Sequence, residues 1–410
     1  MRRKPLFPPV DKTTSKTKED KGRSGHRILC VNGHVWIERR HYHSRGEGTS
    51  TPSDALLDAV EATVSLGVRE MCSAVNAGAR SFVRAAQTLG RAAQITLSHE
   101  ALRTIVESDG KLALQLSRSG ELSPNWTARD CPAPEVGKSL VYLSSDGFMV
   151  PLITHAEKVA RREKAVKKRQ ARGGKHPPMP RVKRGTDQRY KEFKAVMFYD
   201  QKMDHRLVSV TSGNCDHAGK LMRRDAGRIE FATTDSRVGN IDGGPWIIGQ
   251  IHKHHLPMTA TGLDFFHLGE NVHKAQRGIY GEDNPTGKQI AGDLLHTAKH
   301  EGYPPLWEKL IEIRKPCRSP AKRKAADGLL HYVSERREMI QYPMFLANGW
   351  QIGSGPMESQ CRVVPDRVKG PGKRWDTDNA LAVMEYEALY QSRQCTDFWK
   401  AALKHQYALN

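Results

Sequence analysis

The chain has 410 residues, enough for two or three domains with separate hydrophobic cores. It carries 65 Lys and Arg against 45 Asp and Glu, and the resulting net charge of +20 predicts a polyanionic partner, most simply nucleic acid. No apolar stretch is long enough to cross a bilayer and no secretory signal pattern opens the chain, so we expect no membrane role. The 7 cysteines form no close pairs, which argues against a disulfide scaffold and favours a cytoplasmic location.

The amino-terminal end predicts a basic tail followed by a β-hairpin. Residues 1–27 are rich in Lys and Arg and contain almost nothing apolar, which predicts a disordered segment. From residue 28 to 42, β-branched and aromatic residues flank Asn32-Gly33, a dipeptide typical of a two-residue hairpin turn. We therefore expect the ordered part of the chain to begin near Ile28.

Residues 53–118 have the apolar spacing of helices. Their last two segments, Ser81–Leu89 and a second helix capped at Ser98, have the length and polarity of a helix-turn-helix. An ordinary pair of packed helices fits these residues equally well, because no clear base-reading face is present. Prolines mark a linker between residues 120 and 138, so we assign residues 28–135 to a mainly α-helical DNA-binding region.

The sequence changes character at Leu140, where strand-like segments begin. The run Leu140–Gly147 is apolar and places Asp146 at its end. A carboxylate at the end of a buried strand is held rigidly at a cleft, as a metal ligand requires, although an Asp-Gly turn is the ordinary alternative. Residues 157–194 are dense in Lys and Arg, and such a run either is solvated or lies along a DNA backbone.

Two aspartates compete as the second carboxylate candidate. Asp242 precedes Gly243-Gly244-Pro245-Trp246, in which the proline and the aromatic ring would fix the turn after the acid. Asp235 follows the strand-like run Phe231–Thr234 but has no such anchor after it, so we favour Asp242. Residues 269–350 are predicted to be helical, and nothing in them indicates chemistry.

The third candidate lies in the stretch Gly353–Gln360. Pro356 suits the first turn of a helix and Ser354 or Gly355 can cap it, so Glu358 should point out of that turn. An acid beside many cations suits a place where a metal meets a phosphate, although a glutamate favoured by the helix dipole fits equally well. The basic residues that follow Glu358, with one tryptophan among them, are Arg362, Arg367, Lys369, Lys373, Arg374 and Trp375.

Together, Asp146, Asp242 and Glu358 form a set of three carboxylates, each at the edge of a predicted strand or helix. Two divalent cations held by such a set clamp the attacking and leaving oxygens of a phosphoryl transfer. Hard oxygen ligands suit Mg²⁺ or Mn²⁺. The set therefore predicts a two-metal site that cuts and joins DNA.

At these residues the sequence resembles the DDE transposases of bacterial insertion sequences, most of all the IS-Kra kind and more distantly the Mutator-like group. The resemblance covers nearly the whole chain from about residue 28. The stretches that carry it are Ser145-Asp146-Gly147, Asp242-Gly243-Gly244-Pro245-Trp246, Asp264-Phe265-Phe266-His267, Ile352–Ser359 and Arg367–Trp375.

The resemblance implies an α/β fold with an RNase-H-like mixed-sheet core. This core would comprise residues 136–268 and 351–410, interrupted by a helical insertion at 269–350. It also implies that Asp146, Asp242 and Glu358 bind two Mg²⁺ or Mn²⁺ ions, and that His267 orients a DNA strand.

The function implied is that of a DNA transposase, which binds the terminal repeats of its element and joins them to target DNA. We expect it to act as a homo-oligomer on DNA and to be nucleoid-associated. Two rivals are a nuclease or resolvase without a joining step and an inactive DNA-binding derivative. The residues expected to hold the phosphate backbone are Arg362, Arg367, Lys369, Lys373 and Arg374, with Trp375 stacking on a base.

Overall fold

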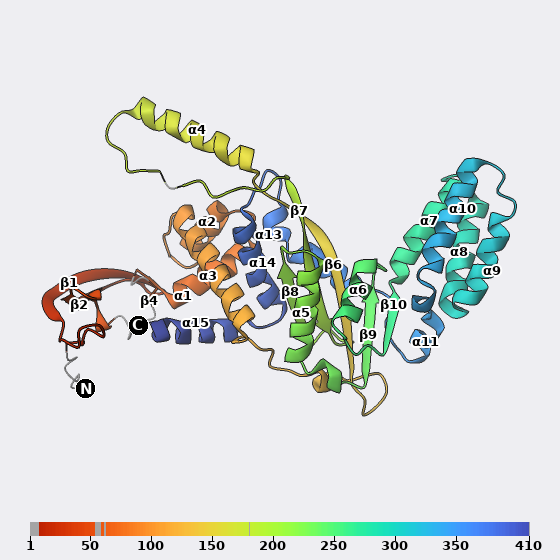
Figure 1. The fold of residues 1–410 in the computed structure, drawn as a ribbon, viewed down its shortest axis with the longest axis horizontal. Coiled ribbons are helices and arrows are strands. Elements are labelled where there is room, and N and C mark those ends of the chain that lie inside the picture. Colours follow the sequence, from red (N-terminus) through yellow and green to blue (C-terminus); the bar gives the residue numbers. More distant parts are fainter. Residues whose placement is uncertain (1–7, 54–58, 61–62, 180, 410) are drawn as a thin grey trace. The chain divides into compact units, whose positions relative to one another are not determined.

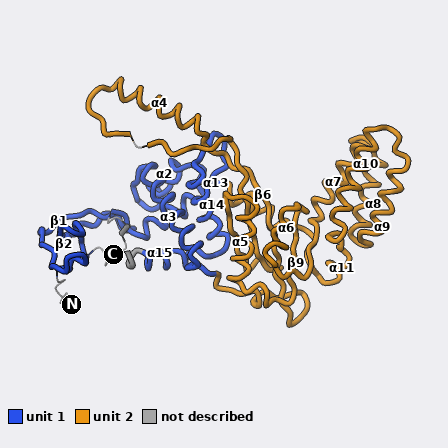
Figure 2. The backbone as a smooth tube through the Cα atoms, in the orientation of Figure 1, with its two compact units in different colours: residues 1–123, 367–410 blue, residues 124–366 orange. Residues whose placement is uncertain are grey.

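The computed structural model describes residues 8–53, 59–60, 63–179 and 181–409. The chain has a mixed α/β fold, as expected, and divides into two compact units (Figures 1 and 2). Unit 1 comprises residues 1–123 and 367–410, and unit 2 comprises residues 124–366. The expectation that residues 351–410 complete the catalytic core is therefore wrong from residue 367 onward, where the chain joins the amino-terminal region.

Unit 1 contains a sheet in the order β3-β2-β1-β5-β4. Its main feature is the hairpin expected at Asn32-Gly33, where Gly33 adopts φ +102° and Cys30 pairs with Gly33 across the turn. The strands are β1 (Glu19–Cys30), β2 (Gly33–Ser44), β3 (Gly48–Ser50), β4 (Ala59–Val60) and β5 (Val64–Ser65).

The hairpin corrects the expected basic tail, because β1 begins at Glu19 within the segment predicted to be disordered. Most residues of β1 are exposed. The backbone ladder and exposed pairs such as Arg40 with Asp20, 3.1 Å apart, hold the strand instead of apolar burial. Residues 19–27 therefore form a strand although they offer almost no apolar side chain to bury. Residues 1–7 of the predicted tail lie outside the described residues.

The helices of unit 1 follow β5. Ser81 and Ser98 are the N-caps of α2 and α3, as predicted, and their hydroxyls accept from the backbone N–H groups of Arg84 and Ala101. The helix expected from residue 53 is wrong at 59–60 and 64–65, which are strands, and residues 54–58 lie outside the described residues. The helices are α1 (Leu66–Gly78), α2 (Phe82–Ala92), α3 (His99–Ser119), α13 (Asp366–Lys369, at the unit boundary), α14 (Thr377–Gln391) and α15 (Cys395–Leu409).

The carboxyl-terminal helix α14 packs on α3. At their closest approach, Gly110 of α3 faces the backbone of Ala382, and a Cβ at Gly110 would collide with it. Leu116, Tyr386 and Phe398 belong to the hydrophobic core that these helices share with α15. Residues near both ends of the sequence therefore build one core.

Unit 2 is built on a second five-stranded sheet, in the order β10-β9-β6-β7-β8. The β6–β7 and β7–β8 pairs are antiparallel, whereas β9 is parallel to both β6 and β10. The strand predicted to end at Asp146 and Gly147 continues without a break to Pro151, so Asp146 lies within β6. The bounds are β6 (Leu140–Pro151), β7 (Tyr190–Tyr199), β8 (Arg206–Thr211), β9 (Ser236–Ile241) and β10 (Ala260–Leu263).

Helices surround this sheet and continue into an insertion between β10 and α12. The insertion begins earlier than the expected residue 269, because β10 ends at Leu263 and α7 starts at Phe265. The α-helices are α4 (His155–Arg172), α5 (Cys215–Arg228), α6 (Pro245–Lys253), α7 (Phe265–Tyr280), α8 (Pro285–His300), α9 (Tyr303–Arg314), α10 (Pro320–Ser334), α11 (Tyr342–Ala347) and α12 (Gly355–Val363). Short 3₁₀ turns lie at Ala128–Asp130, Phe231–Thr233 and Arg337–Met339.

Sheet and insertion share one hydrophobic core. Val141 of β6, Leu268 of α7 and Leu329 of α10 belong to the same cluster of buried side chains. The insertion is therefore packed into unit 2 as part of its core. Within the described part of the chain, no helix is both long and apolar enough to cross a membrane.

Candidate active site

The sheet of unit 2 brings two of the predicted acids to the same position on neighbouring parallel strands. The β6–β9 ladder pairs Leu143 with Gly239, and three residues further along each strand stand Asp146 and Asp242. The Ser144 hydroxyl, between these points, donates a 2.6 Å hydrogen bond to the Asn240 carbonyl. The parallel register therefore places Asp146 opposite Asp242 at the carboxyl end of β9.

The electrostatics of Asp146 agree with this placement. Burial raises the pKa of Asp146, and the charge of Asp242 raises it further. Hydrogen bonds from the Gly147 backbone N–H and the Cys361 side chain lower that pKa in part. Two carboxylates therefore share a half-buried site in which their repulsion is only partly relieved.

A third acid, Asp264, occupies the equivalent position on β10. Leu263 pairs with Ile241 of β9, and the Asp264 backbone N–H donates a 2.7 Å hydrogen bond to the Ile241 carbonyl. The Asp264 side chain is 1% exposed, so its carboxylate needs internal partners. It accepts from the His267 backbone N–H at 2.9 Å, and from both the backbone N–H and the hydroxyl of Ser354.

These hydrogen bonds join two helix starts. Asp264 is the N-cap of α7, which carries His267 one turn later. Ser354 is the N-cap of α12, and its hydroxyl donates to Asp264 and makes no cap hydrogen bond to its own helix. Asp264 thus fixes the beginnings of both helices relative to β10.

Glu358 lies in the first turn of α12 and is exposed, as predicted from Pro356. Met357 and Gln360 are the buried residues of α12, and the helix packs on β6 and β7. Cys361, three residues after Glu358, is on the same side of the helix and hydrogen-bonds to Asp146. The helix is therefore attached to the site at both ends, through Ser354 and through Cys361.

The tightest cluster of potential ligands differs from the expected trio. Among the described residues, one ligand atom each from Asp264, His267 and Glu358 lies within 4.8 Å of the other two. Asp146, Asp242 and Glu358 do not form such a group there. Glu358 thus lies beside the Asp264–His267 pair, and Asp242 and then Asp146 follow on the next two strands of the sheet, on one side of this pair.

His267 has a partly exposed side chain whose Nδ1 lies 3.1 Å from Glu270. Burial alone would lower the pKa of His267, but the hydrogen bond to Glu270 and the charges of Asp264 and other acids raise it overall. The imidazole is therefore set among carboxylates that favour its protonated form.

The competing aspartate, Asp235, lies at the opposite end of β9. Its carboxylate accepts 2.8 Å hydrogen bonds from both the backbone N–H and the hydroxyl of Ser139, at the start of β6. These bonds lower the pKa of Asp235. Asp235 therefore links the beginnings of β6 and β9. Asp242 lies at the other end of β9.

Arg336 is a contributor from the helical insertion that the sequence did not indicate. Its Nη2 donates a 2.9 Å hydrogen bond to the Gly243 carbonyl, directly after Asp242, and its guanidinium lies 4.1 Å from the ring of Tyr332. The turn after Asp242 is thus fixed from the insertion as well as by Pro245 at the start of α6. Trp246, expected to be buried, is only half-buried.

No protein-family model matches the chain, and no curated protein matches it.

Two of the residues expected to bind DNA, Arg367 and Trp375, are buried. Arg367 is 5% exposed, donates a 3.0 Å hydrogen bond to Asn76, and lies 4.4 Å from the Phe82 ring. Trp375 is 7% exposed and packs edge-on against Phe82, with 5.8 Å between ring centroids. Burial lowers the pKa of Arg367 to about 10. The expectation that Arg367 binds phosphate and that Trp375 stacks on a base is therefore wrong, because the two side chains are in the core of unit 1.

The other basic residues of this segment are more accessible. Lys373 donates a 2.9 Å hydrogen bond to the Arg367 carbonyl, and Arg374 donates one of 3.1 Å to the Lys373 carbonyl, so both are half-buried loop braces. Arg362 and Lys369 are exposed. Arg362 belongs to unit 2, one turn after Glu358, whereas Lys369 belongs to unit 1.

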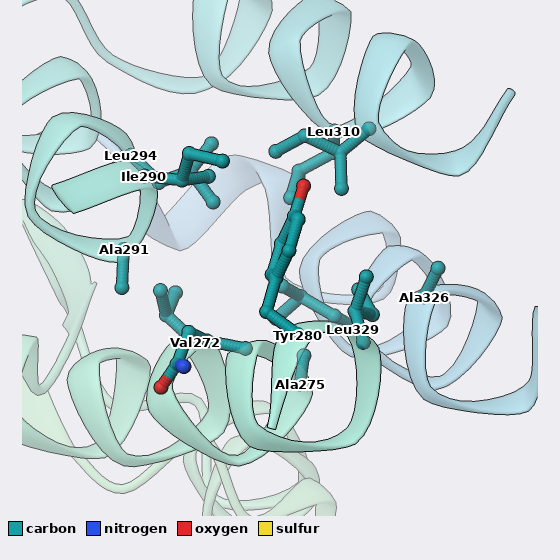
Figure 3. A pocket seen from close by; sticks show the side chains of 12 residues that line it. Val272, Ala275, Tyr280, Ile290, Ala291, Leu294, Leu310, Ala326 and Leu329 are labelled. Atoms are coloured by element: carbon teal, nitrogen blue, oxygen red, sulfur yellow. The ribbon is translucent and has the colours of Figure 1, made fainter. Parts of the chain in front are cut away.

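Two other features of unit 2 lie away from this site. Cys131, Asp200 and His205 form a second group with ligand atoms within 4.8 Å, but Asp200 already accepts from the His205 backbone and lies 3.2 Å from its Nδ1. The helical insertion encloses a small cavity lined mainly by apolar side chains, together with the ring of Tyr280 and the amide of Gln276 (Figure 3). Asp200 and His205 thus hold the turn of the β7–β8 hairpin. The residues described around the cavity in the insertion include no cluster of charged or nucleophilic side chains.

Proposed function

We propose that the chain is a DNA transposase of the DDE type, which cleaves and joins DNA strands at the ends of its element. The observation that carries this proposal is the register of β6 and β9. It sets Asp146 beside Asp242 at one edge of the sheet, where α12 also presents Glu358. The same region holds Glu358, whose nearest potential co-ligands are Asp264 and His267, and in our proposal all three carboxylates act together there.

The topology of unit 2 supports an RNase-H-like core. In chain order, its first three strands form an antiparallel meander, and the next two lie parallel to the first on its other side. Helices α7 to α11 interrupt the chain between the fifth strand and the helix that carries the last acid. This is the order of elements that the resemblance to DDE transposases implies.

The donor set fits Mg²⁺ or Mn²⁺. Asp146, Asp242 and Glu358 offer hard oxygen atoms. Burial raises the pKa of Asp146, and the charge of Asp242 raises it further, as expected where two carboxylates lie close together. When bound, two such ions would activate the attacking oxygen and stabilise the leaving oxygen of a phosphoryl transfer. We propose these three residues as the ligands.

The chain's own residues position this site. Asp264 and Cys361 hold α12 so that Glu358 faces the sheet edge. Asp264 also holds His267 one turn into α7. A ring N–H of His267 can donate a hydrogen bond to a phosphate oxygen of a bound strand. The exposed Arg362 on α12 would then contact the DNA backbone. In unit 1, Lys369 is proposed as a separate contact with the DNA backbone.

In this proposal the chain binds the terminal repeats and the target DNA as a homo-oligomer and is associated with the nucleoid. A nuclease or resolvase with the same ligands, and a derivative that only binds DNA, are the alternatives. A strand-transfer assay with DNA carrying the ends of the element and with Mg²⁺ separates them. Joined product supports the transposase, cut product alone supports the nuclease, and bound but intact DNA supports the derivative.

A further inference from the structure

Helix α4 of unit 2 contributes no buried side chain to the hydrophobic core of the described residues. It has 18 residues and, within the described structure, none of them is buried. A helix normally gains most of its stability by packing an apolar face against a core. Because α4 buries no apolar face against the rest of the described chain, its surface is accessible to a partner molecule.

The helix is nevertheless firmly attached at its start. Thr154 and Glu157 form a reciprocal capping box, in which each side chain accepts from the backbone N–H of the other. The returning segment closes the base with backbone hydrogen bonds from Leu152 to the Arg189 carbonyl at 2.7 Å, and from Thr186 to the Ile153 carbonyl at 3.0 Å. The helix therefore leaves and rejoins the end of the β6–β7 hairpin (Figure 1).

One face of α4 is cationic. Its members, spaced by three or four residues, are Lys158, Arg161, Lys164, Lys168 and Arg172. Such spacing sets side chains on one side of a helix. From Lys158 to Arg172 the face extends over about 21 Å at about 1.5 Å per residue. Along one strand of a duplex the phosphates are about 3.4 Å apart, so the face matches a row of about 6 phosphate charges.

We propose that α4 is a DNA-binding arm that holds the duplex beside the reacting phosphate. This inference rests on the proposed function, and it assigns the DNA contact to a helix outside the site described above. Asp146 and Pro151, the last residue of β6, are five residues apart on one strand, or about 17 Å. The base of the arm thus lies about half a helical turn of DNA from Asp146.

A membrane surface is a poorer match for this helix. Helices that lie in a bilayer interface bury large apolar residues such as Trp, Phe and Leu opposite their cations. The other side of α4 carries no Trp, Phe or Leu: its apolar residues are alanines with Val159 and Val166, and they alternate with Glu163, Lys167 and Gln170. Duplex DNA therefore satisfies the cationic face without requiring an apolar one.

The test replaces Arg161, Lys164 and Lys168 together by Gln in the full chain. All three are exposed and have no ion pair with the described residues, so the fold should not change. The matched control replaces Arg318, Lys322 and Lys324 by Gln. These are also one Arg and two Lys, exposed, at the start of α10 and in the segment before it.

Binding to a fluorescent duplex is measured between 50 and 300 mM salt, roughly the range in which phosphate contacts dominate. The α4 variant should bind at least about tenfold more weakly, with a log–log slope shallower by about 2.7, or about 0.9 for each phosphate that the variant no longer neutralises. The control should bind like the wild type. Circular dichroism should show equal folding of both variants.

Equal binding by the wild type and the α4 variant would overturn the inference, as would an equal loss in the control. Loss of binding to vesicles of anionic lipid, with DNA binding unchanged, would also overturn it and would assign the face to a membrane. Mg²⁺-dependent cleavage by the wild type is measured in parallel. If the wild type cleaves and the α4 variant still binds normally, the arm is wrong while the proposed function stands.

Discussion

Asp264 is the residue that joins the parts of the candidate active site. It follows β10, caps α7 and accepts from Ser354 at the start of α12. Its three donors satisfy a carboxylate that is only 1% exposed. We therefore regard Asp264 as a positioning residue for His267 and Glu358.

Glu358→Gln tests the acid of α12 while preserving its size. Met357 and Gln360 form the buried side of the helix, so the exposed change should leave folding intact. Loss of one negative ligand should reduce Mg²⁺-dependent strand cleavage more than about a hundredfold, with DNA binding unchanged. Cleavage rates and duplex affinity measure the two effects. A variant that joins strands at the wild-type rate would exclude Glu358, and the nearby Asp366 would have to be considered.

Asp242→Asn and Asp235→Asn form a matched pair on one strand. Asp242 ends β9 beside Asp146, whereas Asp235 begins it beside Ser139. Strand cleavage in Mg²⁺ should be lost in the first variant and remain near normal in the second. The opposite result would move the site to the other end of the sheet.

The Asp235 variant should instead show a small loss of stability. Because Ser139 lowers the folded-state pKa of Asp235, the carboxylate stabilises the fold above its unfolded pKa, and this contribution is lost as the pH falls through the folded pKa. Thermal melts should therefore differ from the wild type near neutral pH and converge in acid. A difference that grew in acid would contradict this role.

At the scale of elements, the segment after α12 changes its assignment. Arg367 and Trp375 enclose the Phe82 ring at the start of α2, so residues expected to contact DNA hold unit 1 together. Trp375→Ala should destabilise the chain by about 3 to 5 kcal/mol, the usual cost of removing a buried aromatic side chain. Denaturant unfolding measures this cost, with the exposed Arg362→Gln as the control that leaves stability unchanged. If the Trp375→Ala variant were as stable as the wild type, the indole would not contribute to the core of unit 1.

Local sequence signals predicted many elements correctly. Asn32-Gly33 marked the hairpin, Ser81 and Ser98 marked helix starts, and Pro356 marked the first turn of α12. Each of these signals acts within a few residues, so no tertiary context is needed to interpret it. The strand at Glu19 was missed because its stability comes from a partner strand and not from its own apolar pattern.

The site could be predicted only as separate candidates. That Asp146 and Asp242 share a register follows from the pairing of strands almost a hundred residues apart, which no local pattern encodes. Cys361 could have been suspected, because three residues after Glu358 it lies on the same side of a helix. The sequence contains no comparable signal for the contact of Arg336 with Gly243 or for the burial of Arg367, because both depend on long-range packing.

For the molecule as a whole, the excess of cations predicts binding dominated by phosphate contacts. With 65 Lys and Arg against 45 acids, duplex affinity should fall steeply with salt, with a log–log slope of about −0.9 for each phosphate neutralised. Affinity measured for unrelated duplex sequences over a range of salt concentrations gives this slope. Affinity independent of salt would contradict a nucleic-acid partner held by its backbone.

The central claim is that Asp146, Asp242 and Glu358 hold divalent cations at one edge of the sheet. Fe²⁺ substituted at such a site, with ascorbate and peroxide, cuts the polypeptide beside the bound ion, and end-labelled full-length chain maps the cuts. We predict cuts near residues 146, 242, 264 and 358, suppressed by excess Mn²⁺ and greatly reduced in Asp242→Asn. Cuts confined to the neighbourhood of Cys131, Asp200 and His205, or no metal-dependent cuts at all, would contradict the account.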